Sequence, residues 1–167
     1  SEPYHSTVVI GASLISACGP DAQKHALLAQ IADGSLYLAF AHAERQARFD
    51  LADVQTAAKK TPDGWRLDGR KIAVLDGSAA GQIIVSAGVD SGADKPGKIC
   101  LFLVPQGTPG LVARDFPRLG GGRACNLELR GVHLPAESLL GDGGDALPAI
   151  EAAVDRVSTV SSERGRA

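Results

Sequence analysis

Between positions 35 and 134 the sequence is a succession of short apolar segments separated by turn-forming residues. Thr61-Pro62-Asp63-Gly64 predicts a turn, because Pro presets φ and Gly tolerates a positive φ. Asp68-Gly69 predicts a tight hairpin. The predicted strands span residues 36–42, 54–59, 65–67, 71–75, 82–89, 98–104, 111–114 and 126–129. No helical period interrupts them, so the sequence predicts a mainly β fold, an antiparallel β-barrel or sandwich.

Helical patterns flank this β segment on both sides. The first 34 residues predict two helices, which are divided by Gly19-Pro20, and the second ends at Asp33-Gly34. Residues 146–164 return to a helical period and carry an apolar stripe. We expect this stripe to pack on the first two helices or on a second copy of the chain. The stripe consists of Leu147, Ile150, Val154 and Val157.

The charge balance and the cysteines exclude several kinds of partner. The 167 residues include 17 Lys and Arg and 19 Asp and Glu, so the net charge of -2 offers no basic footprint for nucleic acid or an anionic membrane. The longest apolar runs, 36–41 and 99–104, are far shorter than the ~20 residues that span a bilayer. Cys18, Cys100 and Cys125 form no CxxC pair, which favours buried thiols in a reducing compartment. We therefore expect a cytoplasmic protein that has no metal site and binds neither a membrane nor nucleic acid.

No group of polar residues forms a catalytic site by itself, so the residues point to a β module that binds a partner or ligand. His42 ends the first predicted strand, and sites are often built where strands give way to loops. Asp50 and Asp53 would share one face of a helical turn, which suits acid–base chemistry; the alternative is a solvated acidic turn. The segment 120–123 lacks the Lys-Ser/Thr of a P-loop and is typical of a hairpin loop.

Five phrases in order resemble the acyl-CoA dehydrogenase family. Residues 38–44 and 50–56 are similar to the opening of that family's middle domain, an aromatic-Ala-x-Thr-Glu-Pro-x-x-Gly-Ser-Asp phrase followed by a Thr. Asp63-Gly64-Trp65-x-Leu67-x-Gly69-x-Lys71 resembles the next hairpin of the family. Residues 102–110 and 132–141 resemble the later strands of the family's middle domain. The resemblance extends from about residue 7 to residue 165, nearly the whole chain.

The resemblance implies a layout of three parts. Residues 1–34 would end an N-terminal helical domain, and residues 35–134 would form the middle β-barrel domain. Residues 135–167 would be a linker and the truncated start of a C-terminal helical domain. Because the sequence begins at Ser1 and contains no Met, we expect a fragment of a longer subunit.

The resemblance also implies a chemistry and its partners. Family members use FAD to remove hydrogens from Cα and Cβ of an acyl-CoA thioester; a Glu carboxylate takes the α-proton and the β-hydride passes to the flavin. An electron-transfer flavoprotein then reoxidises the flavin. The implied partners are therefore an acyl-CoA substrate, an electron-transfer flavoprotein and another dehydrogenase chain in a homo- or hetero-oligomer.

The positions that the resemblance assigns to the flavin depart from the family pattern. The family's flavin-bonding Thr falls on Ala43, and its Gly-Ser pair falls on Arg48-Phe49. Its Trp-Ile-Thr phrase, which lines the flavin ring, falls on residues 73–75. The catalytic Glu of some branches would fall on Val157, so we predict no catalytic residue in this chain. The implied cofactor-binding positions are Phe40, His42, Ala43, Arg48, Phe49, Ala73, Val74 and Leu75.

These observations leave more than one function open. Within the family, the chain resembles the small subunit of bacterial pimeloyl-CoA dehydrogenase-type heteromeric enzymes, a likeness carried by Phe40-Ala41, Glu44 and Ala58-Lys59-Lys60-Thr61. The alternatives are a non-catalytic dehydrogenase-like subunit that acts as a structural or binding partner, and an unrelated β-barrel binding module. For this chain alone we expect no activity and no stoichiometric FAD, because the flavin in this family also needs the C-terminal domain and a neighbouring subunit.

Overall fold

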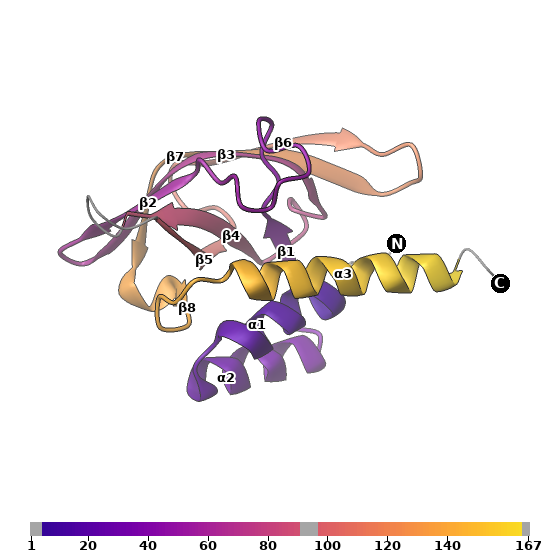
Figure 1. The fold of residues 1–167 in the computed structure, drawn as a ribbon, viewed down its shortest axis with the longest axis horizontal. Helices are drawn as coiled ribbons and strands as arrows, with labels where there is room; N and C mark the ends of the chain where they lie inside the picture. Colours follow the sequence, from indigo (N-terminus) through magenta and orange to yellow (C-terminus); the bar gives the residue numbers. More distant parts are fainter. Residues whose placement is uncertain (1–4, 91–96, 165–167) are drawn as a thin grey trace.

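Helices occupy the two ends of the chain and strands occupy the middle (Figure 1). The computed structural model describes residues 5–90 and 97–164, and the side chains of residues 7–90 and 97–159. The helical elements are η1 (His5–Gly11), α1 (Ala12–Cys18), α2 (Asp21–Ala32), η2 (Ala136–Ser138) and α3 (Leu147–Arg164). The strands are β1 (Leu38–Ala41), β2 (Ala57–Thr61), β3 (Gly64–Leu75), β4 (Gln82–Val89), β5 (Lys98–Pro105), β6 (Leu111–Pro117), β7 (Arg123–Pro135) and β8 (Leu139–Leu140).

The sheet is mixed, which corrects the expectation of a wholly antiparallel arrangement. The strands follow the order β6-β7-β3-β2-β4-β5-β8, and this path is not closed. β1 pairs in parallel with residues 82–85 of β4, and β2 pairs in parallel with residues 88–89. β5 pairs with the whole of β4, so β1 and β2 follow one another along the opposite edge of that strand. Turn residues predict local chain reversals, whereas these parallel pairs join strands that are distant in the sequence.

Asp68-Gly69 is not a hairpin, contrary to the expectation. β3 runs through both residues, and its register against β7 shifts between Leu67 and Gly69. The carboxylate of Asp68 accepts a hydrogen bond from the N–H of Gly131 at 2.7 Å. A Cβ on Gly69 would collide with Thr56, so the glycine is needed for close approach within a bulge. The predicted turn at residues 61–64 is confirmed, because Thr61 and Gly64 pair across it.

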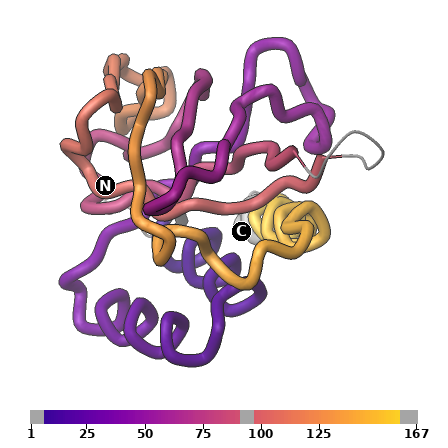
Figure 2. The backbone as a smooth tube through the Cα atoms, turned by 90° about the vertical axis from the view of Figure 1, so that its left-hand side faces the viewer, coloured from indigo at the N-terminus to yellow at the C-terminus, as the bar shows by residue number. Residues whose placement is uncertain are grey.

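Two apolar clusters lie on the two sides of the sheet's central strands. The first fills the interior of the β structure, where the rings of Trp65 and Phe102 meet edge-on at 5.2 Å. The second joins the strands to the helices, which gather on one side of the β structure in Figure 2. Alternate residues of β4 divide between them: Ile83 and Val85 belong to the first cluster and Ile84 to the second. The alternation follows from the two-residue period of a strand.

The apolar stripe of α3 packs back on the N-terminal helices, one of the two arrangements expected. Ile150 and Ala153 are buried in the same cluster as Leu14 and Ile15 of α1. The guanidinium of Arg156 also donates a hydrogen bond to the hydroxyl of Ser13 at 3.2 Å. Figure 1 accordingly shows α3 running alongside α1 on the side of the β structure that the helices cover.

The three cysteines are free thiols, as the sequence predicts. Cys100 and Cys125 are buried and Cys18 is half-buried, and burial raises the pKa of each thiol. Over residues 5–90 and 97–164, no helix is long and apolar enough to cross a membrane. Among the side chains of residues 7–90 and 97–159, no three His, Cys, Asp or Glu gather as metal ligands would.

Candidate functional site

Two of the segments expected at the flavin lie side by side. The carbonyl oxygen of Ala43, just after β1, accepts a hydrogen bond from the N–H of Ile72 in β3 at 2.9 Å. The next N–H, that of Ala73, donates to the side-chain oxygen of Asn126 in β7 at 3.0 Å. Ala43 and Ala73 are both exposed, so the two short side chains leave an open surface at this junction.

The other residues expected to bind the cofactor differ in burial and lie in different parts of the surface and core. The rings of Phe40 and His42 stack at 5.6 Å, and both side chains are half-buried. Val74 is buried in the β core and Leu75 is half-buried, so Val74 is directed away from the surface. Arg48 has a φ of 51° in the loop after β1, and the neighbouring Phe49 is 99% exposed. The eight positions therefore do not form one continuous surface.

A buried ion pair lies beside this junction. The Nζ of Lys71 on β3 is 2.8 Å from Oε1 of Glu44, and the Lys71 side chain is 0% exposed. Nζ also donates to the hydroxyl of Ser86 at 2.9 Å and to the carbonyl oxygen of His42 at 3.2 Å. The Nδ1 of His42 lies 2.8 Å from the same Ser86 hydroxyl. β1, β3 and β4 thus converge on one ammonium group.

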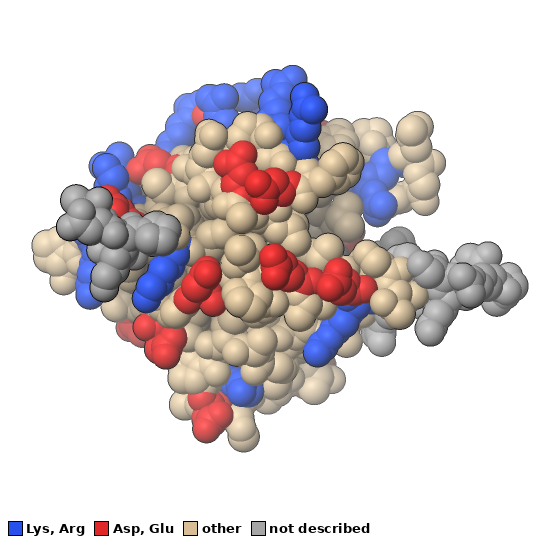
Figure 3. Space-filling model, viewed as in Figure 1, with Lys and Arg blue, Asp and Glu red and all other residues tan. Residues whose placement is uncertain are grey.

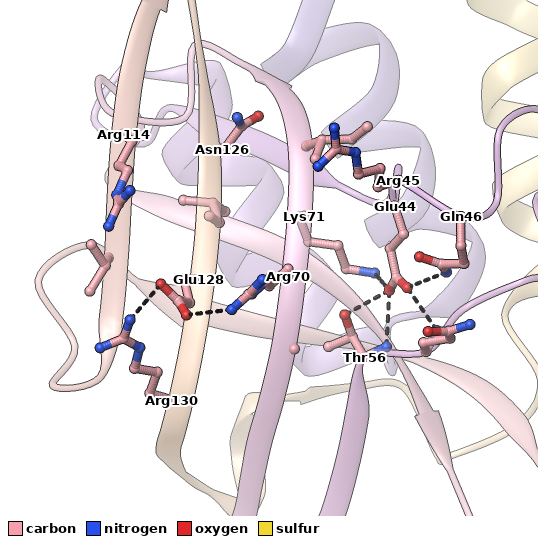
Figure 4. Close-up of a pocket in the computed structure, with 15 residues that line it drawn as sticks. Glu44, Arg45, Gln46, Thr56, Arg70, Lys71, Arg114, Asn126, Glu128 and Arg130 are labelled. Carbon is pink, nitrogen blue, oxygen red and sulfur yellow. Dashed lines mark hydrogen bonds and ion pairs between the residues drawn. The ribbon is translucent and has the colours of Figure 1, made fainter.

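The carboxylate of Glu44 holds the loop between β1 and β2 against the sheet (Figure 4). Its Oε1 accepts hydrogen bonds from the N–H and the hydroxyl of Thr56, at 3.0 and 2.6 Å. Its Oε2 accepts from the N–H of Gln55 and the side-chain amide of Gln46, both at 2.8 Å. No buried side-chain nitrogen or oxygen in the described part of the chain lacks a partner, so the network is fully satisfied.

Burial and pairing shift the pKa values of this network. Burial lowers the pKa of Lys71 to about 8, against the opposing effect of the Glu44 carboxylate. Burial raises the pKa of Glu44, but the hydrogen bonds from Lys71 and Thr56 outweigh it and lower the pKa to about 2. Burial and then the Lys71 charge lower the pKa of His42 to about 4. At neutral pH the site therefore contains an ion pair and an uncharged imidazole.

Sequence reasoning singled out His42 but missed the ion pair. The available signal was a pair of opposite charges beside apolar runs, Glu44 two residues after the predicted strand 36–42 and Lys71 at the start of the predicted strand 71–75. A charged residue in such a segment is buried only when it is paired. Asp50 and Asp53 lie in a turn, where the carboxylate of Asp50 accepts from the N–H of Ala52 at 2.9 Å. The structure thus gives Asp50 a turn-stabilising contact.

A hollow of about 770 Å³ opens on the outer face of β3, β6 and β7, next to the ion pair. Exposed arginines surround it: Arg45 from the loop after β1, Arg70 from β3, Arg114 from β6 and Arg130 from β7 (Figure 4). The carboxylate of Glu128 lies between Arg70 and Arg130, at 3.3 and 2.9 Å from their guanidinium nitrogens. None of the eight expected cofactor positions lines this hollow.

We expect the chain to lose stability in two steps as the pH falls. The pKa of His42 drops from an ordinary 6.5 to about 4 on folding, and that of Glu44 drops from 4.5 to about 2. In both cases the unfolded chain binds protons at a higher pH than the folded chain, so the stability that His42 and Glu44 contribute is complete above pH 6.5. It declines between pH 6.5 and 4 through His42, and between pH 4.5 and 2 through Glu44.

Urea denaturation at half-unit pH steps measures this decline. His42→Gln keeps a polar partner for Ser86 but cannot titrate, so this variant should flatten the curve between pH 6.5 and 4. The Glu44 step below pH 4.5 should remain in the variant. A decline of equal steepness in parent and variant over the upper range would contradict the assignment to His42.

The chain matches the model of the acyl-CoA dehydrogenase middle domain over residues 39–132. It is 34% identical over 143 residues to the short-chain-specific acyl-CoA dehydrogenase of Megasphaera elsdenii, covering 83% of this chain and 37% of that protein. A mixed β domain with flanking helices is therefore the shared unit, and the chain belongs to the acyl-CoA dehydrogenase family. It spans about two fifths of the length of these relatives.

Solved structures agree with this assignment. Butyryl-CoA dehydrogenase from Megasphaera elsdenii superimposes with a TM-score of 0.81 at 30% identity, over 91% of this chain and 40% of that one. Glutaryl-CoA dehydrogenase from Mycobacterium smegmatis, solved in complex with FADH2, superimposes with a TM-score of 0.79 at 27% identity, over 91% of this chain and 38% of that one. Both comparisons include the helices as well as the sheet.

Proposed function

We propose that the chain is part of a FAD-dependent acyl-CoA dehydrogenase subunit that, in its assembled form, oxidises an acyl-CoA thioester between Cα and Cβ. Residues 1–34 and 135–167 would then belong to the helical domains on either side of the middle domain. The observation that carries this proposal is the hydrogen bond from the N–H of Ile72 to the carbonyl of Ala43. It brings together the two segments that the family resemblance assigns to the flavin.

The side chains at this junction do not fit a flavin that is held by side-chain hydrogen bonds. Ala43 and Ala73 offer no donor, and Leu75 stands where the family has a Thr. The carbonyl of Ala43 and the N–H of Ala73 are already hydrogen-bonded within the chain. When bound, FAD would supply the hydride acceptor, and this chain would contribute mainly the backbone surface held in place by Glu44 and Lys71.

The poor fit favours a shared site over a self-sufficient one. We propose that the chain corresponds to the small subunit of a pimeloyl-CoA dehydrogenase-type heteromer, in which a second dehydrogenase chain supplies the catalytic Glu and most flavin contacts. The family resemblance aligns the half-buried Val157 on α3 with the position of that Glu in some branches of the family. An acyl-CoA substrate and an electron-transfer flavoprotein would be partners of the assembled protein.

A non-catalytic subunit is the second candidate function. The same positions favour it, because Ala43, Ala73 and Leu75 remove both side-chain donors and the aromatic ring that the resemblance implies. The buried network around Glu44 would then serve the fold alone. In that case the chain would stabilise a partner dehydrogenase without contacting its flavin.

Introducing hydroxyl donors at the expected flavin positions distinguishes a flavin-binding subunit from a non-catalytic one. We expect the parent chain to lose FAD during gel filtration, and Ala43→Thr combined with Leu75→Thr to tighten FAD binding by about tenfold to a hundredfold. The expected gain follows from about 0.5–1.5 kcal/mol for each net hydrogen bond. Quenching of FAD fluorescence during titration measures the affinity.

A matched control keeps this test specific. Ala79→Thr adds the same hydroxyl at an exposed turn residue between β3 and β4 and should leave the affinity unchanged. If the double variant binds FAD no better than Ala79→Thr, the placement of the flavin is wrong and the non-catalytic function is favoured. Tight retention of FAD by the parent chain would show that the side-chain donors are not needed.

A further inference from the structure

The hollow on the outer face of β3, β6 and β7 is strongly cationic, although the chain as a whole has a net charge of -2. Five cationic side chains and two carboxylates line it: Arg45, Arg70, Lys71, Arg114 and Arg130, with Glu44 and Glu128. Figure 3 shows Lys and Arg gathered along the upper edge of the molecule, the side on which Figure 1 places β3 and β6. The local charge therefore has the opposite sign from that of the chain.

The two carboxylates are already used by neighbouring cations. Glu44 pairs with the buried Lys71, and Glu128 is shared between Arg70 and Arg130. Among the described side chains, those of residues 7–90 and 97–159, no carboxylate lies within ion-pair distance of Arg45 or Arg114. Two guanidinium groups on opposite sides of the hollow are thus available to an incoming anion.

A neutral donor adds to these charges. Asn126 lies beside Arg114 in the β6–β7 register, and its side-chain oxygen accepts from the N–H of Ala73. Because the oxygen is engaged, the NH2 group of Asn126 remains as a donor at the rim of the hollow. Planar guanidinium groups together with an amide donor suit the oxygens of a phosphate group.

We propose that this hollow binds a phosphate-bearing small molecule, with Arg45 and Arg114 as its main anion contacts. The volume of about 770 Å³ lies in the range of small-molecule sites. The site goes beyond the proposed dehydrogenase function, because the positions assigned to the flavin, among them Ala43, Ala73 and Leu75, do not line it. Inorganic pyrophosphate and a nucleoside diphosphate share the required chemistry.

Isothermal titration calorimetry of the chain with pyrophosphate, ADP and adenosine tests the site. We expect pyrophosphate and ADP to bind at low ionic strength and adenosine not to bind, with affinities that fall as salt is added. ADP binding tighter than pyrophosphate would identify a nucleotide site, and equal binding would identify a site for the phosphates alone. Both results support the proposal.

Substitutions test whether Arg45 and Arg114 make the anion contacts. Arg45→Gln and Arg114→Gln should each weaken pyrophosphate binding by about tenfold or more, since a charge-assisted hydrogen bond is lost. Arg118→Gln, at the end of the β6–β7 hairpin outside the hollow, removes the same charge and should change the affinity less than about twofold. Circular dichroism confirms that each variant is folded.

Several results would overturn the proposal. These are no binding of pyrophosphate or ADP by the parent, equal binding of ADP and adenosine, and equal losses in Arg114→Gln and Arg118→Gln. The last would show general attraction to a positive surface rather than a site. FAD affinity in the Ala43→Thr/Leu75→Thr variant is a separate measurement, so failure of the anion site and failure of the proposed function are distinguishable.

Discussion

Lys71→Met is expected to lower the free energy of unfolding by about 3–5 kcal/mol, because it leaves the buried Glu44 carboxylate without its counter-charge. The methionine has a similar length, but it cannot donate to Glu44, to the Ser86 hydroxyl or to the His42 carbonyl. The loop that Glu44 holds through Thr56 should loosen at the same time. Urea denaturation followed by circular dichroism measures the loss.

An exposed ion pair on the same strand supplies the control. Arg70→Met breaks the contact with Glu128 at the surface and should cost less than about 1 kcal/mol. Combining Lys71→Met with Glu44→Gln removes both charges, and this double variant should be more stable than Lys71→Met alone. If Lys71→Met costs no more than Arg70→Met, the buried pair does not stabilise the folded chain as proposed.

Phe102→Ala is expected to cost about 3–5 kcal/mol, through lost burial and the cavity that remains. Phe102 is fully buried on β5, and its ring meets Trp65 edge-on at 5.2 Å. The cavity would lie in the β core, where neighbouring strands prevent collapse around it. Thermal and urea denaturation should both show the loss.

The matched control for this prediction is Phe116→Ala on the edge strand β6. Phe116 is 36% exposed, and its truncation should change stability by less than about 1 kcal/mol. Equal losses in the two variants would mean that the ring of Phe102 contributes no more than a surface residue. Trp65 fluorescence gives an independent readout, because its environment should change only in Phe102→Ala.

Local sequence patterns correctly predicted the helix boundaries, the turn and the strand bounds that depend on neighbouring residues. Gly19-Pro20 divides α1 from α2, and the turn at residues 61–64 joins β2 to β3. The strand predicted over 82–89 has these bounds, and the predicted last helix begins one residue later, at Leu147. These features depend on residues within a few positions of one another, such as turn formers and apolar periods.

Predictions that needed contacts between distant residues were incomplete. The parallel pairing of β1 and β2 with β4 joins segments that no local turn connects, so turn residues did not reveal it. Asp68-Gly69 has the composition of a hairpin, yet the close approach of Thr56 makes it a bulge. Each outcome depends on a partner strand that the local sequence does not specify.

The sequence by itself determined the family and the positions of the helices and most strands, because these are properties of residue identity and order. It also places Ala43, Ala73 and Leu75 at positions that the family resemblance assigns to the flavin. Only the tertiary structure decided that Glu44 and Lys71 meet, that Val74 turns inward and that four arginines from separate segments share one hollow. Electrostatic and packing free energies depend on distance in space and on exclusion of water. Both arise only when β1, β3, β6 and β7 are brought together.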